Sequence, residues 1–224
     1  IAADGSSVLD YYYNRQTYVL SWDAKGGTLS GTYTAGAVLY QAPIVAPTAT
    51  RTGYTFAVWA PAFSTIPPTM PHGDVTYEAQ WTANKYVVDL DHQGGSSSMG
   101  SVLVTYDSIM PAVEVPVLPG YFFKGYYTLP NGQGSQYYLD NGNSLQVWNV
   151  DGDTVVYAHW TPDPNTPYIV EHYQQNLDGS TYPTTPTEVD NLSDTTNIQV
   201  IPAVRTYEGF TSPEPDTIIV TADT

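Results

Sequence analysis

The stretch 18-YVLSWDAKGG-27 decides how this chain folds, because it returns further along the chain as 86-YVVDLDHQGG-95. Tyr, Val, Asp and the Gly pair recur in the same order. Two later phrases keep the register: Gly53 to Trp59 matches Gly120 to Tyr126, and Asp74 to Thr82 matches Asp153 to Thr161. Three matched phrases in one order indicate a tandem duplication, and a duplicated chain folds as a series of small units.

Each opening phrase alternates as a half-buried β-strand does. In the first phrase Tyr18, Leu20 and Trp22 fall on one face, and in the second Tyr86, Val88 and Leu90 do. The Gly pair that follows supplies turn positions at which a positive φ costs little. We therefore expect each unit to open with a strand and a tight turn.

The composition favours β-structure and excludes several classes of function. The 224 residues include 20 Tyr, 18 Gly and 18 Pro, and no long run has helical spacing. A net charge of −16, from 22 acidic and six basic residues, repels nucleic acid and gives no attraction to an anionic bilayer. No apolar run reaches the roughly 18 residues of a membrane span. The absence of Cys excludes disulfides and thiolate chemistry.

Aromatic side chains must supply most of the core, because a unit of about 70 residues buries only about 60% of its unfolded surface. The phrase Gly-Tyr-x-Phe-x-x-Trp/Tyr carries several of them on one strand. The predicted core residues, which recur at equivalent positions of the two units, are Tyr18, Trp22, Tyr54, Phe56, Trp59, Trp81, Tyr86, Leu90, Tyr121, Phe123 and Trp160.

A third segment follows the short linker 162-PDPNTP-167. It opens with 168-YIVEHYQQNLDG-179, which reads as a strand and an Asp-Gly turn. Ala222-Asp223 repeats Ala3-Asp4, so 8-VLDYYYNR-15 is predicted to be the closing strand of an upstream copy of this segment, with Leu9, Tyr11 and Tyr13 on one face. The expected organisation is therefore a closing strand in 1–15, repeats in 16–83 and 84–162, and a truncated module in 168–224.

The first two units, residues 16 to about 162, resemble the Listeria-Bacteroides repeat, also called the internalin B-repeat. The consensus of that repeat is Tyr-x-Val-x-Phe-Asp-x-x-Gly-Gly, then Gly-Tyr-x-Phe-x-Gly-Trp, then Tyr-Ala-x-Trp-Thr. In this chain Trp22 and Leu90 replace the usual Phe of the first motif. The third segment is similar to the mucin-binding-protein (MucBP) repeat through Tyr168 to Tyr173, Asp178-Gly179 and Tyr207 to Phe210.

These resemblances imply small β-grasp-like modules in an elongated array. They imply a secreted protein of the bacterial cell surface or cell wall, in which the array is a non-catalytic stalk or spacer of an adhesin with a part in cell adhesion. The alternative is an array that itself binds a host glycan or surface protein.

No residue pattern predicts an enzyme, a metal site or a cofactor. The four histidines fall at unlike positions, without metal-ligand spacing, and no Gly-x-Ser-x-Gly elbow appears. The phrases 140-DNGNS-144 and 151-DGD-153 offer oxygen ligands for calcium, but they lack the full calcium-loop spacing and also fit hairpin turns. We expect no metal, no cofactor and no catalytic residue.

The candidate ligand-binding residues are Tyr137, Tyr138 and Trp148. They lie where the second unit is longer than the first by about ten residues, and insertions often carry function. If these aromatic side chains are exposed, they favour binding of a host ligand; if they are buried, they favour a stalk. A further expected partner is a second copy of the chain, joined head to tail through strand 8–15.

Overall fold

The computed structural model describes residues 4–6 and 8–222, and this part of the chain contains fifteen strands and no helix. The prediction of a mainly β protein is confirmed, whereas the β-grasp-like detail stays a prediction. The described residues accordingly offer no helix that could cross a lipid bilayer. The chain divides into two compact units between Lys85 and Tyr86, with residues 149–151 grouped with the first.

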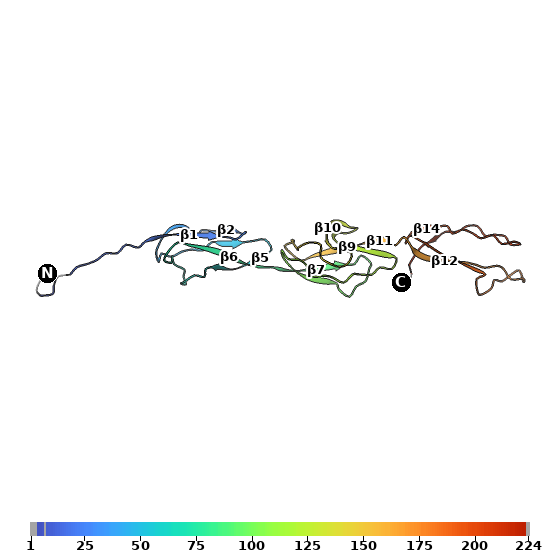
Figure 1. Ribbon diagram of the computed structural model, residues 1–224, viewed down its shortest axis with the longest axis horizontal. Helices are drawn as coiled ribbons and strands as arrows, with labels where there is room; N and C mark the ends of the chain where they lie inside the picture. The colour runs from blue at the N-terminus through green and yellow to red at the C-terminus, as the bar shows by residue number, and fades with distance from the viewer. Residues whose placement is uncertain (1–3, 7, 223–224) are drawn as a thin grey trace. The chain divides into compact units, whose positions relative to one another are not determined.

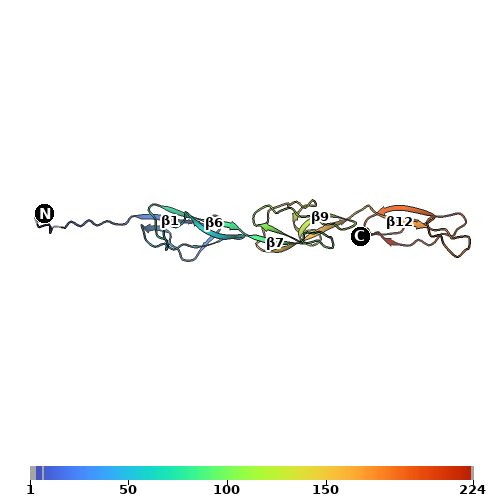
Figure 2. The same ribbon diagram turned by 90° about the horizontal axis from the view of Figure 1, so that it is seen from below.

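The first repeat is a four-stranded sheet in the order β3-β1-β6-β5. Its opening strand β1 lies beside its closing strand β6 (Figures 1 and 2). The two strands are parallel, with Leu20 opposite Val75 and Trp22 opposite Tyr77. Strand β6 is also antiparallel to β5, so the closing strand is central. The strands of the repeat are β1 (Thr17–Asp23), β2 (Thr28–Ser30), β3 (Gly36–Leu39), β4 (Thr48–Thr50), β5 (Tyr54–Ala60) and β6 (Val75–Ala83), of which β2 and β4 pair separately.

The second repeat has the same plan in a five-stranded sheet of order β10-β9-β11-β7-β8. Its strands are β7 (Lys85–Asp91), β8 (Ser101–Thr105), β9 (Tyr121–Leu129), β10 (Gln133–Tyr138) and β11 (Thr154–Pro162). Strand β11 is parallel to β7, with Leu90 opposite Val156. In both repeats an Asp just before the closing strand accepts a 2.7 Å hydrogen bond from a backbone amide of the opening strand: Asp74 from Val19, and Asp153 from Val87.

The repeated Gly pair clamps a tryptophan of the closing strand. The first glycine of each pair has a positive φ, 85° at Gly26 and 89° at Gly94. The second leaves room for an indole ring: a Cβ on Gly27 would lie 2.6 Å from Trp81, and one on Gly95 would lie 2.5 Å from Trp160. The indole Nε1 atoms of Trp81 and Trp160 donate 2.9 Å hydrogen bonds to the carbonyls of Ala24 and His92 in the same turns. Each copy of the repeated sequence thus forms a turn that contacts the tryptophan of its own closing strand.

Several of the aromatic residues predicted to form the core pack against one another. Trp59, Leu90 and Phe123 are buried, and the other predicted core residues are half-buried. The rings of Trp22 and Trp59 have centroids 4.9 Å apart, and those of Phe123 and Trp160 are 5.4 Å apart. Such angled aromatic pairs contribute roughly 0.5–1.5 kcal/mol each beyond their buried area.

The third segment has paired ribbons but little interior. Strand β12 (Thr166–His172) is antiparallel to β13 (Glu188–Asp194), and β14 (Gln199–Val200) is antiparallel to β15 (Ile218–Ile219). The described residues after Asp163 include three buried side chains, Thr166, Thr196 and Val220. The Thr196 hydroxyl donates a 2.7 Å hydrogen bond to the Gly120 carbonyl, which ties this segment to the second repeat within one unit.

Residues 8–15 form no strand, and their side chains are exposed. Tyr12 and Tyr13 are each 90% exposed. Ala3 and Asp223, on which part of the predicted relation to the third segment rests, lie outside the described residues. The assignment of 8–15 as a closing strand stays a prediction, as does a separate boundary between the second repeat and the third segment.

Candidate binding surfaces

Tyr137, Tyr138 and Trp148, the residues predicted to bind a ligand, lie inside the second repeat. Their exposed fractions are 3%, 0% and 0%. The Tyr138 hydroxyl donates a 3.1 Å hydrogen bond to the Pro111 carbonyl, and burial raises its pKa to about 12. These side chains therefore cannot present a surface for ligand in this fold, and their prediction as a binding site is corrected to a structural role.

Tyr137 and Trp148 are buried because the inserted segment folds back on strand β10 and on Ser108. The amide of Leu145 donates to the Tyr137 carbonyl at 2.8 Å, and the amide of Trp148 donates to the Ser108 carbonyl at 3.0 Å. The Trp148 ring then packs on the Tyr137 ring with centroids 5.0 Å apart. The insertion thus enlarges the core of the second repeat.

The phrase 140-DNGNS-144 forms a hairpin turn in the same insertion. The Asn141 side-chain oxygen accepts a 3.0 Å hydrogen bond from the amide of Asn143, and the amide of Gly142 donates to the Leu139 carbonyl at 3.1 Å. Asp153 holds the amide of Val87, as described above. Over residues 4–6 and 8–222, no three His, Asp or Glu side chains gather closely enough to hold a metal ion.

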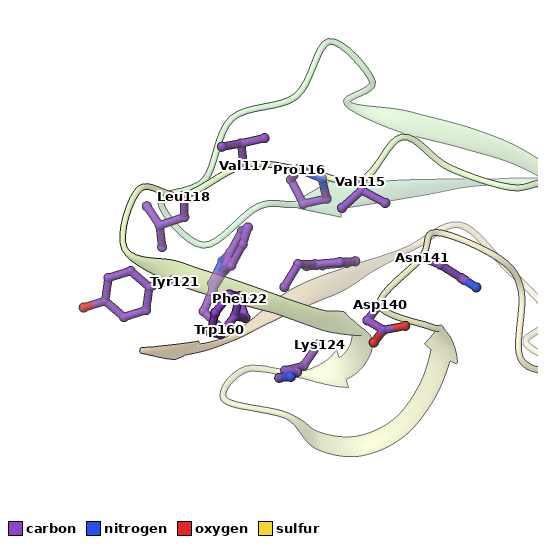
Figure 3. Close-up of a pocket in the computed structure, with 11 residues that line it drawn as sticks. Val115, Pro116, Val117, Leu118, Tyr121, Phe122, Lys124, Asp140, Asn141 and Trp160 are labelled. Carbon is purple, nitrogen blue, oxygen red and sulfur yellow. The ribbon is translucent and has the colours of Figure 1, made fainter. Parts of the chain in front are cut away.

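An open apolar groove of about 510 Å³ lies on the surface of the second repeat (Figure 3). Figure 3 shows residues 115–118 along one side of the groove and Tyr121, Phe122 and Trp160 across from them, with Lys124, Asp140 and Asn141 toward one end. Phe122 is 47% exposed and Val117 is 63% exposed. Lys124 Nζ lies 5.7 Å from the centroid of the Phe122 ring. The groove offers an apolar wall with a polar end.

The groove depends on side chains that the first repeat does not share. By the repeat alignment Leu118 corresponds to Arg51, whose guanidinium carbon lies 3.7 Å from the centroid of the Tyr54 ring. Asp140 and Asn141 belong to the insertion. Sequence analysis missed this surface because the matched phrases mark only the shared part of its lining, Tyr121, Phe123 and Trp160, whereas Leu118, Asp140 and Asn141 have no counterpart of the same kind in the first repeat.

A second hollow, of about 770 Å³, lies in the third segment along residues 171–177 and 204–213. Two polar side chains that line it, His172 and Arg205, contact carboxylates of β13. Arg205 Nε donates to Asp190 Oδ2 at 3.0 Å, and Arg205 Nη1 donates to Glu188 Oε1 at 2.7 Å. His172 Nε2 lies 3.1 Å from Asp190 Oδ2. Hydrogen bonds from Arg205 and His172 lower the pKa of Asp190 to about 2.

The four histidines lie in separate surroundings. His92 Nδ1 is 2.6 Å from the Tyr126 hydroxyl, and His172 faces Asp190 as described above. The rings of His72 and His159 contact Tyr18 and Tyr127, respectively, with centroids 5.1 and 5.7 Å apart. Each histidine is thus engaged within its own repeat or segment.

Comparison with known proteins identifies the repeats. The family model described as the Listeria-Bacteroides repeat domain matches residues 18–80 and 86–159. Internalin H of Listeria monocytogenes serovar 1/2a (strain ATCC BAA-679 / EGD-e) is 30% identical over 165 residues, which take in 68% of this chain and 27% of internalin H. The chain therefore spans about a quarter of the length of that relative. Because the two matched copies take in more than half of its residues, the chain belongs to the Listeria-Bacteroides repeat family.

Proposed function

We propose that this chain is a non-catalytic spacer, or stalk, of a secreted bacterial cell-surface protein. Membership of the repeat family and the similarity to internalin H support a place in the repeat region of a surface protein. The observation that carries the proposal is mechanical: in both repeats the first and last strands lie side by side and run in the same direction.

That pairing suits a part that must withstand tension. A pull that enters at Thr17 and leaves at Ala83 draws β1 and β6 in opposite directions along their shared axis. The hydrogen bonds of the parallel ladder are evenly spaced, so they resist together instead of opening one at a time. The hydrogen bonds from Val19 to Asp74 and from Val87 to Asp153 brace the same strand pairs.

Single-molecule stretching of the chain tests the proposal. The first repeat runs from Thr17 to Ala83, and the second, which is longer, runs from Lys85 to Pro162. At about 3.5 Å per extended residue, unfolding should release roughly 200 Å, and the second repeat roughly 40 Å more than the first. Two discrete steps of these sizes are expected.

Matched substitutions assign each step to its repeat. Asp74→Ala should lower the unfolding force of the shorter step alone, and Asp153→Ala that of the longer step alone, because each removes one brace between paired strands. Extension at low force without discrete steps would contradict a mechanical role. So would aspartate variants that leave both unfolding forces unchanged.

A spacer must also extend. We expect small-angle scattering to give a radius of gyration well above the roughly 17 Å that a compact domain of this length would have. A radius of gyration equal to that of a compact domain would contradict the spacer.

Direct binding of a host glycan or surface protein is the second candidate function, and the exposed groove beside Phe122 favours it. Titration calorimetry with N-acetyllactosamine, as a representative host glycan, provides a first test. Binding that is abolished by Phe122→Ala would support this function. Phe56, on the strand of the first repeat that corresponds to β9, is unsuitable for a control substitution because it packs on Trp59 and Trp81. Thr55→Ala, at an exposed position on the equivalent strand of the first repeat, should leave the affinity unchanged.

A further inference from the structure

In each repeat the closing strand lies between two other strands, and the third segment contains a counterpart of each of these two. Strand β12 corresponds to β1 and β7, since Tyr168 aligns with Tyr18 and Tyr86. The turn at Tyr207–Phe210 is the same turn that precedes β5 and β9. The amide of Phe210 donates to the Tyr207 carbonyl at 3.1 Å, just as Tyr54 donates to Arg51 and Tyr121 to Leu118 at that distance. Gly209 has a φ of 85°, and the corresponding Gly53 and Gly120 have φ values of 75° and 74°.

In the two repeats the closing strand lies between these neighbours. Strand β6 lies between β1 and β5, and β11 lies between β7 and β9. In the third segment β12 pairs with β13 along one edge, and nothing within residues 4–6 and 8–222 pairs with its other edge as a strand. Residues 210–216, which correspond to the start of β5 and β9, are exposed and form no strand.

An apolar side chain at the second of these edges is uncovered. Phe210, the first of residues 210–216, is 46% exposed. The hollow of about 770 Å³ lies along residues 171–177 and 204–213, which include the end of β12 and the segment after the shared turn. A single added strand would therefore bond to both edges and cover the hollow between them.

Residues 8–15 have the pattern of such a strand. The inward residues of the two observed closing strands are Tyr77, Ala79 and Trp81 in β6, and Val156, Ala158 and Trp160 in β11. Leu9, Tyr11 and Tyr13 have the same alternate spacing and are exposed in the structure. We propose that residues 8–15 of one copy insert into the third segment of a second copy, between β12 and residues 210–216, as its closing strand.

The observed ladders predict the direction and the register of this insertion. The donated strand should run parallel to β12. By the alignment His172 takes the place of Leu90, and Leu9, the first inward residue of the donated strand, takes the place of Val156. Because Leu90 lies opposite Val156, Leu9 should lie opposite His172. Ser212 corresponds to Phe56 and Phe123, and Tyr13, the third inward residue, corresponds to Trp81 and Trp160. Because Phe56 lies opposite Trp81 and Phe123 opposite Trp160, Tyr13 should lie opposite Ser212 in an antiparallel pair. Arg15 then falls opposite Phe210, beside the carboxylate of Glu208, which matches the charges of donor and acceptor.

The contact joins two different surfaces, so it is head to tail. Within residues 4–6 and 8–222 each copy offers the donor segment 8–15 and the acceptor edge of β12, and a heterologous contact of this kind can extend from copy to copy. Its backbone hydrogen bonds supply affinity, and the alternating side chains supply register.

Light scattering and hydrogen exchange test the insertion in the full chain. The mass should rise with concentration, and amide exchange in β12 and in residues 210–216 should slow by more than about tenfold as the copies associate. Deletion of residues 1–15 should abolish both effects. A peptide of residues 4–16 added to the deleted chain should restore the slow exchange, and a scrambled peptide should not.

Cross-linking tests the register, because the chain has no Cys of its own. The pair Tyr13→Cys and Ser212→Cys places two thiols directly opposite, where cross-strand Cβ atoms lie about 4.5–5.5 Å apart, and should give disulfide-linked multimers. Tyr12→Cys with Ser212→Cys, on opposite faces, should not. The proposal is overturned by a monomer at all concentrations, by unchanged exchange after the deletion, or by equal cross-linking of the two pairs.

Discussion

Gly95→Ala should destabilise the second repeat by crowding the tryptophan of its closing strand. A Cβ on Gly95 would lie 2.5 Å from Cζ2 and 3.2 Å from Cη2 of Trp160, and 3.2 Å from the His92 carbonyl oxygen. The indole cannot move freely, because its Nε1 is hydrogen bonded to that same carbonyl at 2.9 Å. The indole also contacts the ring of Phe123.

The expected loss is about 1–2 kcal/mol, because overpacking a well-filled site costs roughly 1–3 kcal/mol. Replacing Gly with Ala also reduces the entropy of the unfolded chain, which offsets about 0.4–1 kcal/mol. For a unit of this size, each kcal/mol lowers the melting temperature by about 4–8 °C, so the second repeat should melt roughly 5–15 °C earlier.

Gly100→Ala is the matched control. Gly100 belongs to the same repeat, its φ lies outside the left-handed region, and a Cβ there would meet nothing within 4 Å. Hydrogen exchange of β7 and β11 should be faster in Gly95→Ala and unchanged or slower in Gly100→Ala. Combining Gly95→Ala with Trp160→Phe should cost less than the sum of the two single changes, because the smaller ring relieves the clash. Equal destabilisation by Gly95→Ala and Gly100→Ala would refute the predicted clash between residue 95 and Trp160. Strictly additive losses of stability in the double variant with Trp160→Phe would also refute it.

Three further outcomes are expected. Burial raises the pKa of Tyr138 from 10.0 to about 12, so its contribution to stability is complete below pH 10 and is lost as the pH rises toward 12; the alkaline transition of the second repeat, followed by circular dichroism, should be shallower in Tyr138→Phe. The pKa of Asp190 is lowered from 3.8 to about 2, chiefly by its hydrogen bonds from Arg205, so the stability it gives to the β12–β13 hairpin is present above pH 3.8 and is lost as the pH falls toward 2; exchange of the hairpin amides should show this loss, and Arg205→Gln should weaken the pH dependence. Thermal melts with calcium and with chelator should coincide, and a large stabilisation by calcium would contradict the assignment of 140-DNGNS-144 as a hairpin turn.

The strands and turns of the repeats could be predicted because their signals are local. Alternation placed Tyr18, Leu20 and Trp22 on one face, and the structure leaves Val19 exposed between the first two. The Gly pair predicted a turn with positive φ, which Gly26 and Gly94 adopt. Period-two spacing and positive φ are properties of a few adjacent residues, so a single sequence reveals them.

The fate of the inserted aromatic residues could not be predicted in the same way. Whether Tyr137 and Trp148 are buried depends on hydrogen bonds between the insertion and residues 107–108, which lie far earlier in the chain. Such an insertion can either project into solvent or fold back, and its composition fits both outcomes. The apolar groove was missed for a related reason, since Val117 and Asp140 come together only when the insertion turns toward the segment before β9.

The central place of the closing strand connects the spacer with the proposed assembly. In each repeat the closing strand pairs with the opening strand and also with the strand that follows the shared Gly-Tyr turn. The sheet is therefore continuous only when the closing strand is in place. Under the proposed spacer function, the same strand pair would carry tension in shear. If residues 8–15 close the third segment of another copy, the new parallel pair with β12 would join two copies by the bonding pattern that holds each repeat together. Tension would then pass from copy to copy through a ladder of the same kind, and such an assembly would lengthen a spacer without a mechanically different joint.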